Sequence, residues 1–134
     1  MYYGALEAGG TKMVCAIGDA DKNIIDRISI PTGTPDQSVP AMIDYFKKYD
    51  ISALGIGTFG PADINPNSPT YGSIMRSPKK DWEGFSLYKA FTDVLGCLVV
   101  VDTDVNAAAW GEYLYGALKG LNSGMYLTVG TGIG

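Results

Sequence analysis

A short glycine-rich segment near the amino terminus, Glu7-Ala8-Gly9-Gly10-Thr11-Lys12, constrains the fold of this chain more than any other feature. It lies between two apolar runs of strand length, Tyr2 to Leu6 and Met13 to Ile17. The pattern predicts a β-hairpin whose tip carries an acidic residue, two glycines and a hydroxyl group. Because glycine leaves no side chain in the turn, backbone N–H groups there can approach an anion closely and bind a phosphate.

A second glycine-rich segment, Val129-Gly130-Thr131-Gly132-Ile133-Gly134, follows an apolar run that predicts a strand from Met125 to Val129. Either segment alone could be an ordinary tight turn, but two of them at strand ends favour phosphate binding. Since the chain stops inside this second segment, we expect it to be the amino-terminal part of a longer protein.

The composition excludes several classes of function. The 134 residues carry a formal net charge of −4, which argues against a nucleic-acid partner because phosphate neutralisation needs clustered Lys and Arg. The chain has no histidine, so a Ser–His–Asp triad is excluded and a zinc site is disfavoured.

No apolar run approaches the roughly 20 residues that span a bilayer, and the start lacks the features of a signal peptide. We therefore expect a cytoplasmic protein without a membrane partner, with Cys15 and Cys97 as buried free thiols.

The predicted elements follow one another in the order βββ-α-β-α-β-α-β, which indicates an α/β fold with a mixed sheet and flanking helices. We expect strands at residues 2–6, 13–17, 24–30, 51–58, 98–101 and 125–129, and helices at 34–49, 85–95 and 106–118. The wholly apolar strand 98–101 is expected to be buried on both faces. The proline-rich stretch 60–78 is expected to be a long loop that covers a site.

Capping residues predict where the first and third helices begin. Thr34-Pro35-Asp36-Gln37 fits a capping box with proline at the first helical position, although Pro40 leaves open a start at Ser38. Asn106 is expected to cap the third helix and Gly120 to end it.

Two glycine motifs resemble nucleotide-binding fingerprints but fail on their context. Gly55 to Gly60 matches G-x-G-x-x-G, yet Pro61 and a loop follow instead of the helix that the dinucleotide fingerprint requires. Gly10-Thr11-Lys12 is similar to a Walker A motif, but Thr11 separates the glycine from the lysine, which must be adjacent there.

The strongest catalytic candidate is Asp104, within Asp102-Thr103-Asp104-Val105-Asn106. This segment lies where the strand 98–101 ends and the third helix begins, and the carboxyl ends of strands are where α/β sheets bind ligands. A carboxylate there could accept a proton from an attacking hydroxyl group. Asp102 is expected to be structural.

Taken together, the motifs resemble those of the ROK family of sugar kinases (repressor, open reading frame, kinase), most closely its bacterial fructokinase branch. The resemblance covers essentially the whole chain. It implies the amino-terminal lobe of an actin-like, ribonuclease H-like ATPase fold in residues 1–120. Residues 121–134 would then be the first strand and phosphate loop of a second lobe that is otherwise absent. It is carried by Glu7 to Lys12, Gly55 to Pro61, Ser77-Pro78-Lys79 with Trp82, Thr103 to Glu112, and Thr128 to Gly134.

The resemblance implies transfer of the γ-phosphate of ATP to a hexose, with fructose 6-phosphate as the expected product, and it implies Mg²⁺ as a cofactor. Asp104 would be the general base, and Glu7 would hold Mg²⁺ through water. The sugar pocket would include Gly60, Pro61 and Thr103 beside Asp104. The two phosphate loops would be formed by Gly9, Gly10, Thr11 and Lys12, and by Gly130, Thr131 and Gly132.

Several alternatives remain open on the residues alone. The sugar could be glucose or an amino sugar, or the protein could sense a sugar without turning it over. An actin-like structural ATPase is disfavoured by Thr103-Asp104-Val105-Asn106. A homodimer is compatible with the sequence, and the resemblance implies zinc only in a later part of the family's chain, not in this one.

Overall fold

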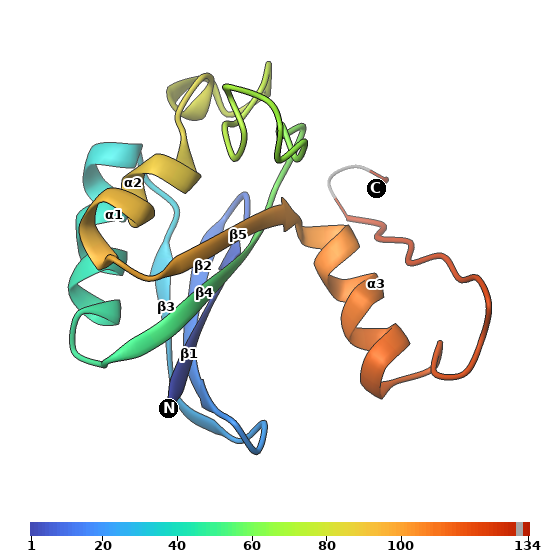
Figure 1. Ribbon diagram of the computed structural model, residues 1–134. Coiled ribbons are helices and arrows are strands. Elements are labelled where there is room, and N and C mark those ends of the chain that lie inside the picture. Colours follow the sequence, from blue (N-terminus) through green and yellow to red (C-terminus); the bar gives the residue numbers. More distant parts are fainter. Residues whose placement is uncertain (131–132) are drawn as a thin grey trace.

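The computed structural model describes residues 1–130 and 133–134 and confirms the predicted mixed α/β architecture (Figure 1). Its strands are β1 (Tyr2–Ala8), β2 (Lys12–Asp19), β3 (Ile24–Pro31), β4 (Ile51–Thr58) and β5 (Leu98–Thr103). Its helices are α1 (Pro35–Phe46), α2 (Leu87–Leu95) and α3 (Asp104–Tyr115), with a short 3₁₀ helix, η1 (Lys80–Trp82), before α2.

The strands form one sheet in the order β3-β2-β1-β4-β5. Antiparallel pairing joins β1, β2 and β3, whereas β4 runs parallel to both β1 and β5. α1 and α2 cover one face of this sheet, and α3 lies on its other side at the end of β5 (Figure 1). The predicted hairpin is therefore present, and its two strands occupy the middle of the sheet.

The main core lies between the sheet and the helices α1 and α2. Leu6 and Ala8 of β1 are buried on this side, while the residues that alternate with them are exposed. Phe46 of α1 and Phe91 of α2 are fully buried and meet edge to face, with ring centroids 6.1 Å apart. Each such side chain contributes about 1.5–3 kcal/mol by leaving water, so the packing of this layer stabilises the fold.

α1 begins at Pro35, as its capping box predicts, and not at Ser38. The N–H of Thr34, the N-cap residue, donates to Oε1 of Gln37 over 3.1 Å, which closes the box. Pro40 lies inside the helix on its exposed side. Water can therefore satisfy the carbonyl group that loses its helical partner there.

The structure corrects the predicted starts of α2 and α3. α2 begins two residues later than expected because the hydroxyl of Ser86 accepts the N–H of Lys89 over 3.2 Å. α3 begins before Asn106, because Thr103 is its N-cap and its Oγ1 accepts the N–H of Asn106 over 3.2 Å. The side chain of Asn106 donates instead to Oδ1 of Asp102 over 2.8 Å.

α3 also ends earlier than predicted, at Tyr115 with Gly116 as its C-cap, and Gly120 lies beyond it. The cause is Glu112, whose carboxylate accepts the N–H of Ala117 over 2.7 Å. This side chain takes the place of the next helical carbonyl and stops the helix.

The expectation that strand 98–101 is buried on both faces is wrong. Val99 and Val101 are buried, but Leu98 is 66% exposed and Val100 is 51% exposed. β5 is the edge strand of the sheet and is covered only on the side of α2. Its other face is open.

The predicted strand 125–129 is not formed. Val129 makes one isolated bridge to Ile133, and the residues from Met125 to Gly130 are exposed. Strands depend on a neighbouring strand for their backbone hydrogen bonds, and none of the described strands pairs with this segment.

The two cysteines are free, as predicted, but they differ in exposure. Cys15 lies in the core, and burial raises its thiol pKa to about 12, whereas Cys97 is half-buried and burial raises its pKa as well. Since the thiolate is the reactive form, we expect a thiol reagent to label Cys97 in the native protein and Cys15 only after unfolding. Labelling of native Cys97→Ser protein at the rate of the unfolded chain would contradict this expectation.

Candidate active site

The register of the three central strands brings three chain segments to one edge of the sheet. Ala8, at the end of β1, pairs with Thr58, at the end of β4, which in turn pairs with Thr103, at the end of β5. Because neighbouring strands lie about 4.8 Å apart, these residues span only about 10 Å. The hairpin tip, the loop after β4 and the start of α3 therefore leave the sheet side by side, where α/β sheets bind their ligands.

The hairpin tip is held from one side by Thr32. Its hydroxyl donates to the carbonyl oxygen of Gly9 over 2.8 Å, and its N–H donates to the carbonyl oxygen of Thr11 over 3.0 Å. The N–H of Gly9 donates to Lys12, and a Cβ at Gly9 would lie 2.6 Å from that carbonyl oxygen. Among the described residues, the N–H groups of Gly10 and Thr11 have no acceptor. The tip thus presents free donors, as anion-binding turns do.

Asp104 is the first residue of α3, with its side chain at the end of β5. Its Oδ1 accepts the N–H of Val105 over 2.9 Å, and its Oδ2 accepts no hydrogen bond from the described part of the chain. Asp102 is used differently, because its Oδ1 accepts both the N–H of Thr103 and the amide of Asn106. Asp102 therefore links β5 to the first turn of α3 through its Oδ1, and in both carboxylates Oδ2 accepts no hydrogen bond from the described residues.

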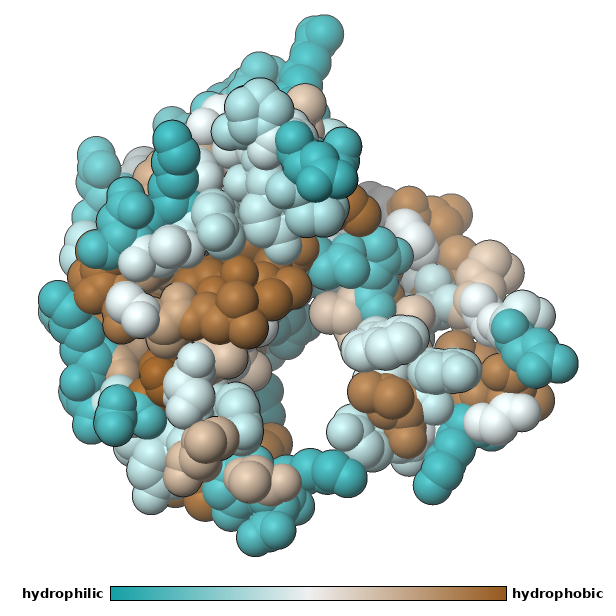
Figure 2. All heavy atoms as spheres, viewed as in Figure 1, coloured by the Kyte–Doolittle hydropathy of each residue, from teal (hydrophilic) through white to brown (hydrophobic). Residues whose placement is uncertain are grey.

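A pocket of about 720 Å³ lies between α3 and the open face of β1, β4 and β5. This is within the size range of small-molecule sites. The space-filling view in Figure 2 shows the molecule hollowed between the sheet body and the part made by α3 and the segment after it. Carboxylates enter the lining from Glu7, Asp102 and Asp104, and most of the rest is apolar. The same pocket thus receives the residue before the hairpin tip and the expected general base.

Gly55 and Gly57 place no side chain on the floor of this pocket. A Cβ at Gly57 would lie 3.0 Å from the Cβ of Ala107 and 3.4 Å from the Cα of Asp104. Gly57 therefore allows α3 to pack directly against β4. This close approach explains a glycine of the G-x-G-x-x-G pattern without any dinucleotide.

The loop after β4 is fixed to the same edge of the sheet. It begins with the N–H of Phe59 donating to the carbonyl oxygen of Ala8 over 2.8 Å, and it continues through the cis peptide Gly60-Pro61. Further on, the hydroxyl of Tyr71 accepts the N–H of Val101 over 2.8 Å and donates to its carbonyl oxygen over 3.0 Å. Tyr71 thereby attaches the loop to β5, and nothing in the sequence distinguishes it from the other tyrosines.

Asp63 organises the middle of this loop. Its carboxylate accepts hydrogen bonds from the hydroxyls of Ser68 and Thr70 and from the N–H of Asn65. These bonds, that of Ser68 first, hold the pKa of Asp63 below its ordinary value of 3.8.

The second glycine-rich segment is described in part, because Thr131-Gly132 lies outside the described residues. Thr128 and Gly134 exchange two backbone hydrogen bonds, of 2.9 and 3.0 Å, and Gly130 between them is exposed. A Cβ at Gly134 would lie 3.7 Å from Cγ1 of Val105. This segment therefore ends against the first turn of α3, although it forms no strand.

Within residues 1–130 and 133–134, no three or more His, Cys, Asp or Glu side chains are grouped to hold a metal ion. None of the helices in this part of the chain is long and apolar enough to cross a membrane.

The chain is similar to known proteins over nearly its whole length. Residues 3–134 match the family model described as the ROK family. The chain belongs to the ROK family. It is 44% identical to a fructokinase of Pediococcus pentosaceus and 45% identical to a fructokinase of Lactococcus lactis subsp. cremoris. Both alignments cover 100% of the chain but only 46% and 45% of these relatives, so the chain spans less than half of their length.

Solved structures of the ROK family confirm the predicted fold class, an actin-like ATPase lobe. A ROK family glucokinase from Streptomyces griseus, crystallised with glucose and AMPPNP, matches the chain with a TM-score of 0.83 at 30% identity. The match covers 100% of this chain and 43% of that one. The resemblance seen in the motifs therefore extends to the backbone.

Substituting Gly57 should displace α3. We expect Gly57→Ala to lower the free energy of unfolding by about 1–3 kcal/mol, since the added methyl group meets Ala107. Gly55→Ala is the matched control, because a Cβ at Gly55 meets nothing within 4 Å. Thermal and urea unfolding of the two variants would measure the difference. Equal stability of both variants would contradict the close packing of α3.

The loop should also respond to pH through Asp63. Because the pKa of Asp63 is lowered by folding, the stabilisation from its hydrogen bonds is present above pH 3.8 and is lost as the pH falls through the folded pKa. Asp63→Asn should accelerate hydrogen exchange in residues 60–78 at pH 7 and reduce the loss of protection between about pH 5 and pH 2. The exposed Asp50→Asn variant should exchange like the wild type. Unchanged exchange in Asp63→Asn would show that this carboxylate does not order the loop.

Proposed function

We propose that the protein containing this chain transfers the γ-phosphate of ATP to a hexose, with fructose as the preferred substrate and fructose 6-phosphate as the product. The observation that carries this proposal is the register Ala8–Thr58–Thr103, which gathers the hairpin tip, the loop after β4 and the start of α3 at one sheet edge. Phosphoryl transfer depends mainly on positioning and charge neutralisation. The shared edge supplies the positioning, and the free N–H donors of the hairpin tip supply part of the charge neutralisation.

The residues divide into a phosphate side and a sugar side. On the phosphate side, Gly9 to Lys12 bind phosphate oxygens of ATP, and Gly130 to Gly132 form the second loop. On the sugar side, Gly60-Pro61 and Thr103 contact the sugar. The hydroxyl of Thr103 caps α3 as an acceptor, so its proton remains available for a sugar oxygen.

Asp104 is the general base in this proposal. Its carboxylate takes the proton from the sugar hydroxyl as that oxygen forms a bond to the γ-phosphorus and the bond to the β-phosphate oxygen breaks. Support comes from the free Oδ2 and from the place of Asp104 in the pocket that Glu7 also lines. ADP and the sugar phosphate are the products.

The carboxylates of this pocket fit a Mg²⁺ ion that is also held by water and by the phosphates of the nucleotide. The described residues form no cage of three acidic ligands, but Mg²⁺ in phosphoryl-transfer sites is commonly held by one or two carboxylates, water and the substrate's phosphates. Glu7, next to the hairpin tip, is the residue that would hold it. When bound, the ion neutralises charge on the phosphates.

We propose fructose rather than glucose as the substrate because the chain is 44% and 45% identical to the two fructokinases but 30% identical to the glucokinase crystallised with glucose. A glucokinase is the second candidate, since that structure shares the fold at a TM-score of 0.83. A third candidate is a sugar sensor, which would bind a sugar at the same residues but would not transfer a phosphate to it.

We further propose that residues 1–120 form the amino-terminal lobe and that residues 121–134 begin a second lobe. None of the side chains of α3 is buried, and the residues from Leu121 to Gly130 are exposed. These surfaces lack the packing that a second lobe would provide.

The proposal predicts the behaviour of Asp104→Asn. In the full-length protein this substitution should lower kcat about 100- to 10,000-fold, because the amide cannot accept the hydroxyl proton. The measurement is ATP-dependent phosphorylation of fructose, glucose, mannose and N-acetylmannosamine. Asp93→Asn, on the exposed side of α2, should leave the rate unchanged.

If the wild-type protein phosphorylates fructose fastest and Asp104→Asn loses this activity, both the kinase function and the role of Asp104 as general base are supported. Turnover of Asp104→Asn at the wild-type rate would refute the assigned base. Sugar binding without turnover by the wild-type protein would refute the kinase and favour a sensor.

A further inference from the structure

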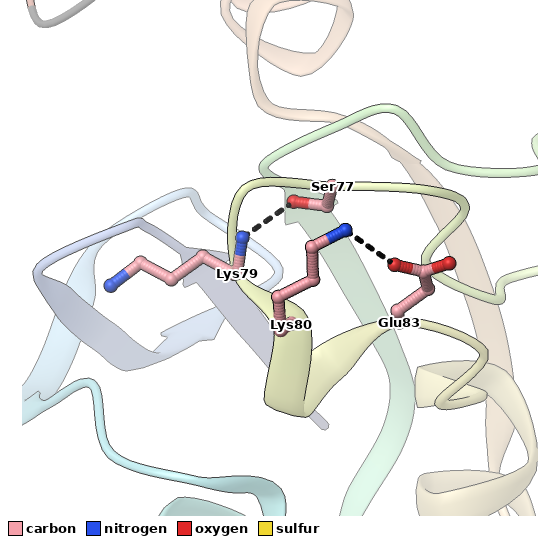
Figure 3. Close-up of polar contacts among 4 residues, drawn as sticks. All are labelled: Ser77, Lys79, Lys80 and Glu83. Atoms are coloured by element: carbon pink, nitrogen blue, oxygen red, sulfur yellow. Dashed lines mark hydrogen bonds and ion pairs between the residues drawn. The ribbon is translucent and has the colours of Figure 1, made fainter.

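Lys79 is distant from the hairpin in sequence but lies beside its tip. A Cβ placed on Gly10 would lie 3.8 Å from Cε of Lys79. In Figure 3 the side chain of Lys79 extends away from Lys80 and Glu83 and toward the turn that joins β1 and β2. We propose that Lys79 is a further ligand of the phosphate group that the hairpin tip binds.

Two buried residues, Ser77 through its side chain and Trp82 through its backbone N–H, fix the backbone of Lys79. The hydroxyl of Ser77, which is 4% exposed, accepts the N–H of Lys79 over 3.2 Å (Figure 3). Trp82, which is 1% exposed, donates its N–H to the carbonyl oxygen of Lys79 and its indole N–H to Gly33 over 2.9 Å. Gly33 follows Thr32, the residue that holds the hairpin tip. Lys79 and the tip therefore share one hydrogen-bonded support.

The neighbouring lysine behaves differently. Nζ of Lys80 lies 3.3 Å from Oε2 of Glu83, and its side chain is 70% exposed, so it forms an ordinary surface ion pair. Lys79 forms no ion pair with any of the described residues. Its ammonium group is therefore available for an anion from outside the chain.

The chemistry around Lys79 suits a phosphate. An ammonium group supplies a full positive charge and three donors, and it stands beside a turn whose Gly10 and Thr11 N–H groups have no acceptor among the described residues. Backbone donors can orient a phosphate, and a lysine neutralises its charge as a point charge. This inference rests on the proposed function for the identity of the ligand, the polyphosphate of ATP.

Binding of AMPPNP and of AMP to the full-length protein, by calorimetry, tests the inference. Lys79→Met keeps most of the length of the side chain and removes its charge. It should weaken AMPPNP binding at least about 10-fold, the effect of losing a charge-assisted hydrogen bond, and leave AMP binding unchanged. Lys79→Arg should retain most of the affinity. Lys80→Met is the matched control and should bind both nucleotides like the wild type.

Parallel assays of sugar phosphorylation by the wild-type protein separate this inference from the proposed function. Loss of AMPPNP affinity only in Lys79→Met supports the inference even if no sugar is phosphorylated. Active wild-type enzyme with equal AMPPNP affinity in Lys79→Met and Lys80→Met overturns the inference and leaves the kinase intact. A wild-type protein that binds no AMPPNP overturns both.

Discussion

The parallel pairing of β4 with β1 on one side and β5 on the other determines where every part of the candidate active site lies. Ala8, Thr58 and Thr103 end their strands in register, so the three segments that follow start from one edge. A slip of one residue would move each buried side chain to the open face, so burial of the core also fixes the register. The packing that stabilises the sheet thus also aligns the site.

The loops at this edge are held mainly by hydrogen bonds from side chains to backbone groups. Thr32 binds the two carbonyl oxygens of the hairpin tip, Tyr71 binds both backbone groups of Val101, and Trp82 binds Gly33. The bonds from Thr32 use carbonyl oxygens of the tip, and the N–H groups of Gly10 and Thr11 have no acceptor among the described residues. Gly57 completes the arrangement because it lets α3 approach β4 and brings Asp104 to the pocket.

The sequence predicted those parts of the fold that depend on local chemistry. The hairpin, the capping box of α1 and strand β4 follow from glycine, threonine, proline and apolar spacing, and the structure has them where they were expected. The prediction that Asn106 caps α3 was wrong. Threonine and asparagine are both good N-caps, so residue type alone does not show that the cap is Thr103; the hydrogen bond from the N–H of Asn106 to its Oγ1 does. The prediction of a strand at 125–129 was wrong because a strand needs a neighbouring strand, and a local apolar pattern does not show whether one is present. The approach of Lys79 to Gly10 depends on the path of a long loop, which no spacing rule describes.

We propose that the hairpin tip binds the phosphate that the sugar hydroxyl attacks, and that Asp104 takes the proton of that hydroxyl. A crystal structure of the full-length protein with fructose and AMPPNP would test it most directly. The account predicts that the terminal phosphate contacts the N–H groups of Gly10 and Thr11, and that a fructose hydroxyl donates to Asp104 while facing that phosphate. A nucleotide whose phosphates lie away from the hairpin tip, or a sugar bound out of reach of Asp104, would contradict it.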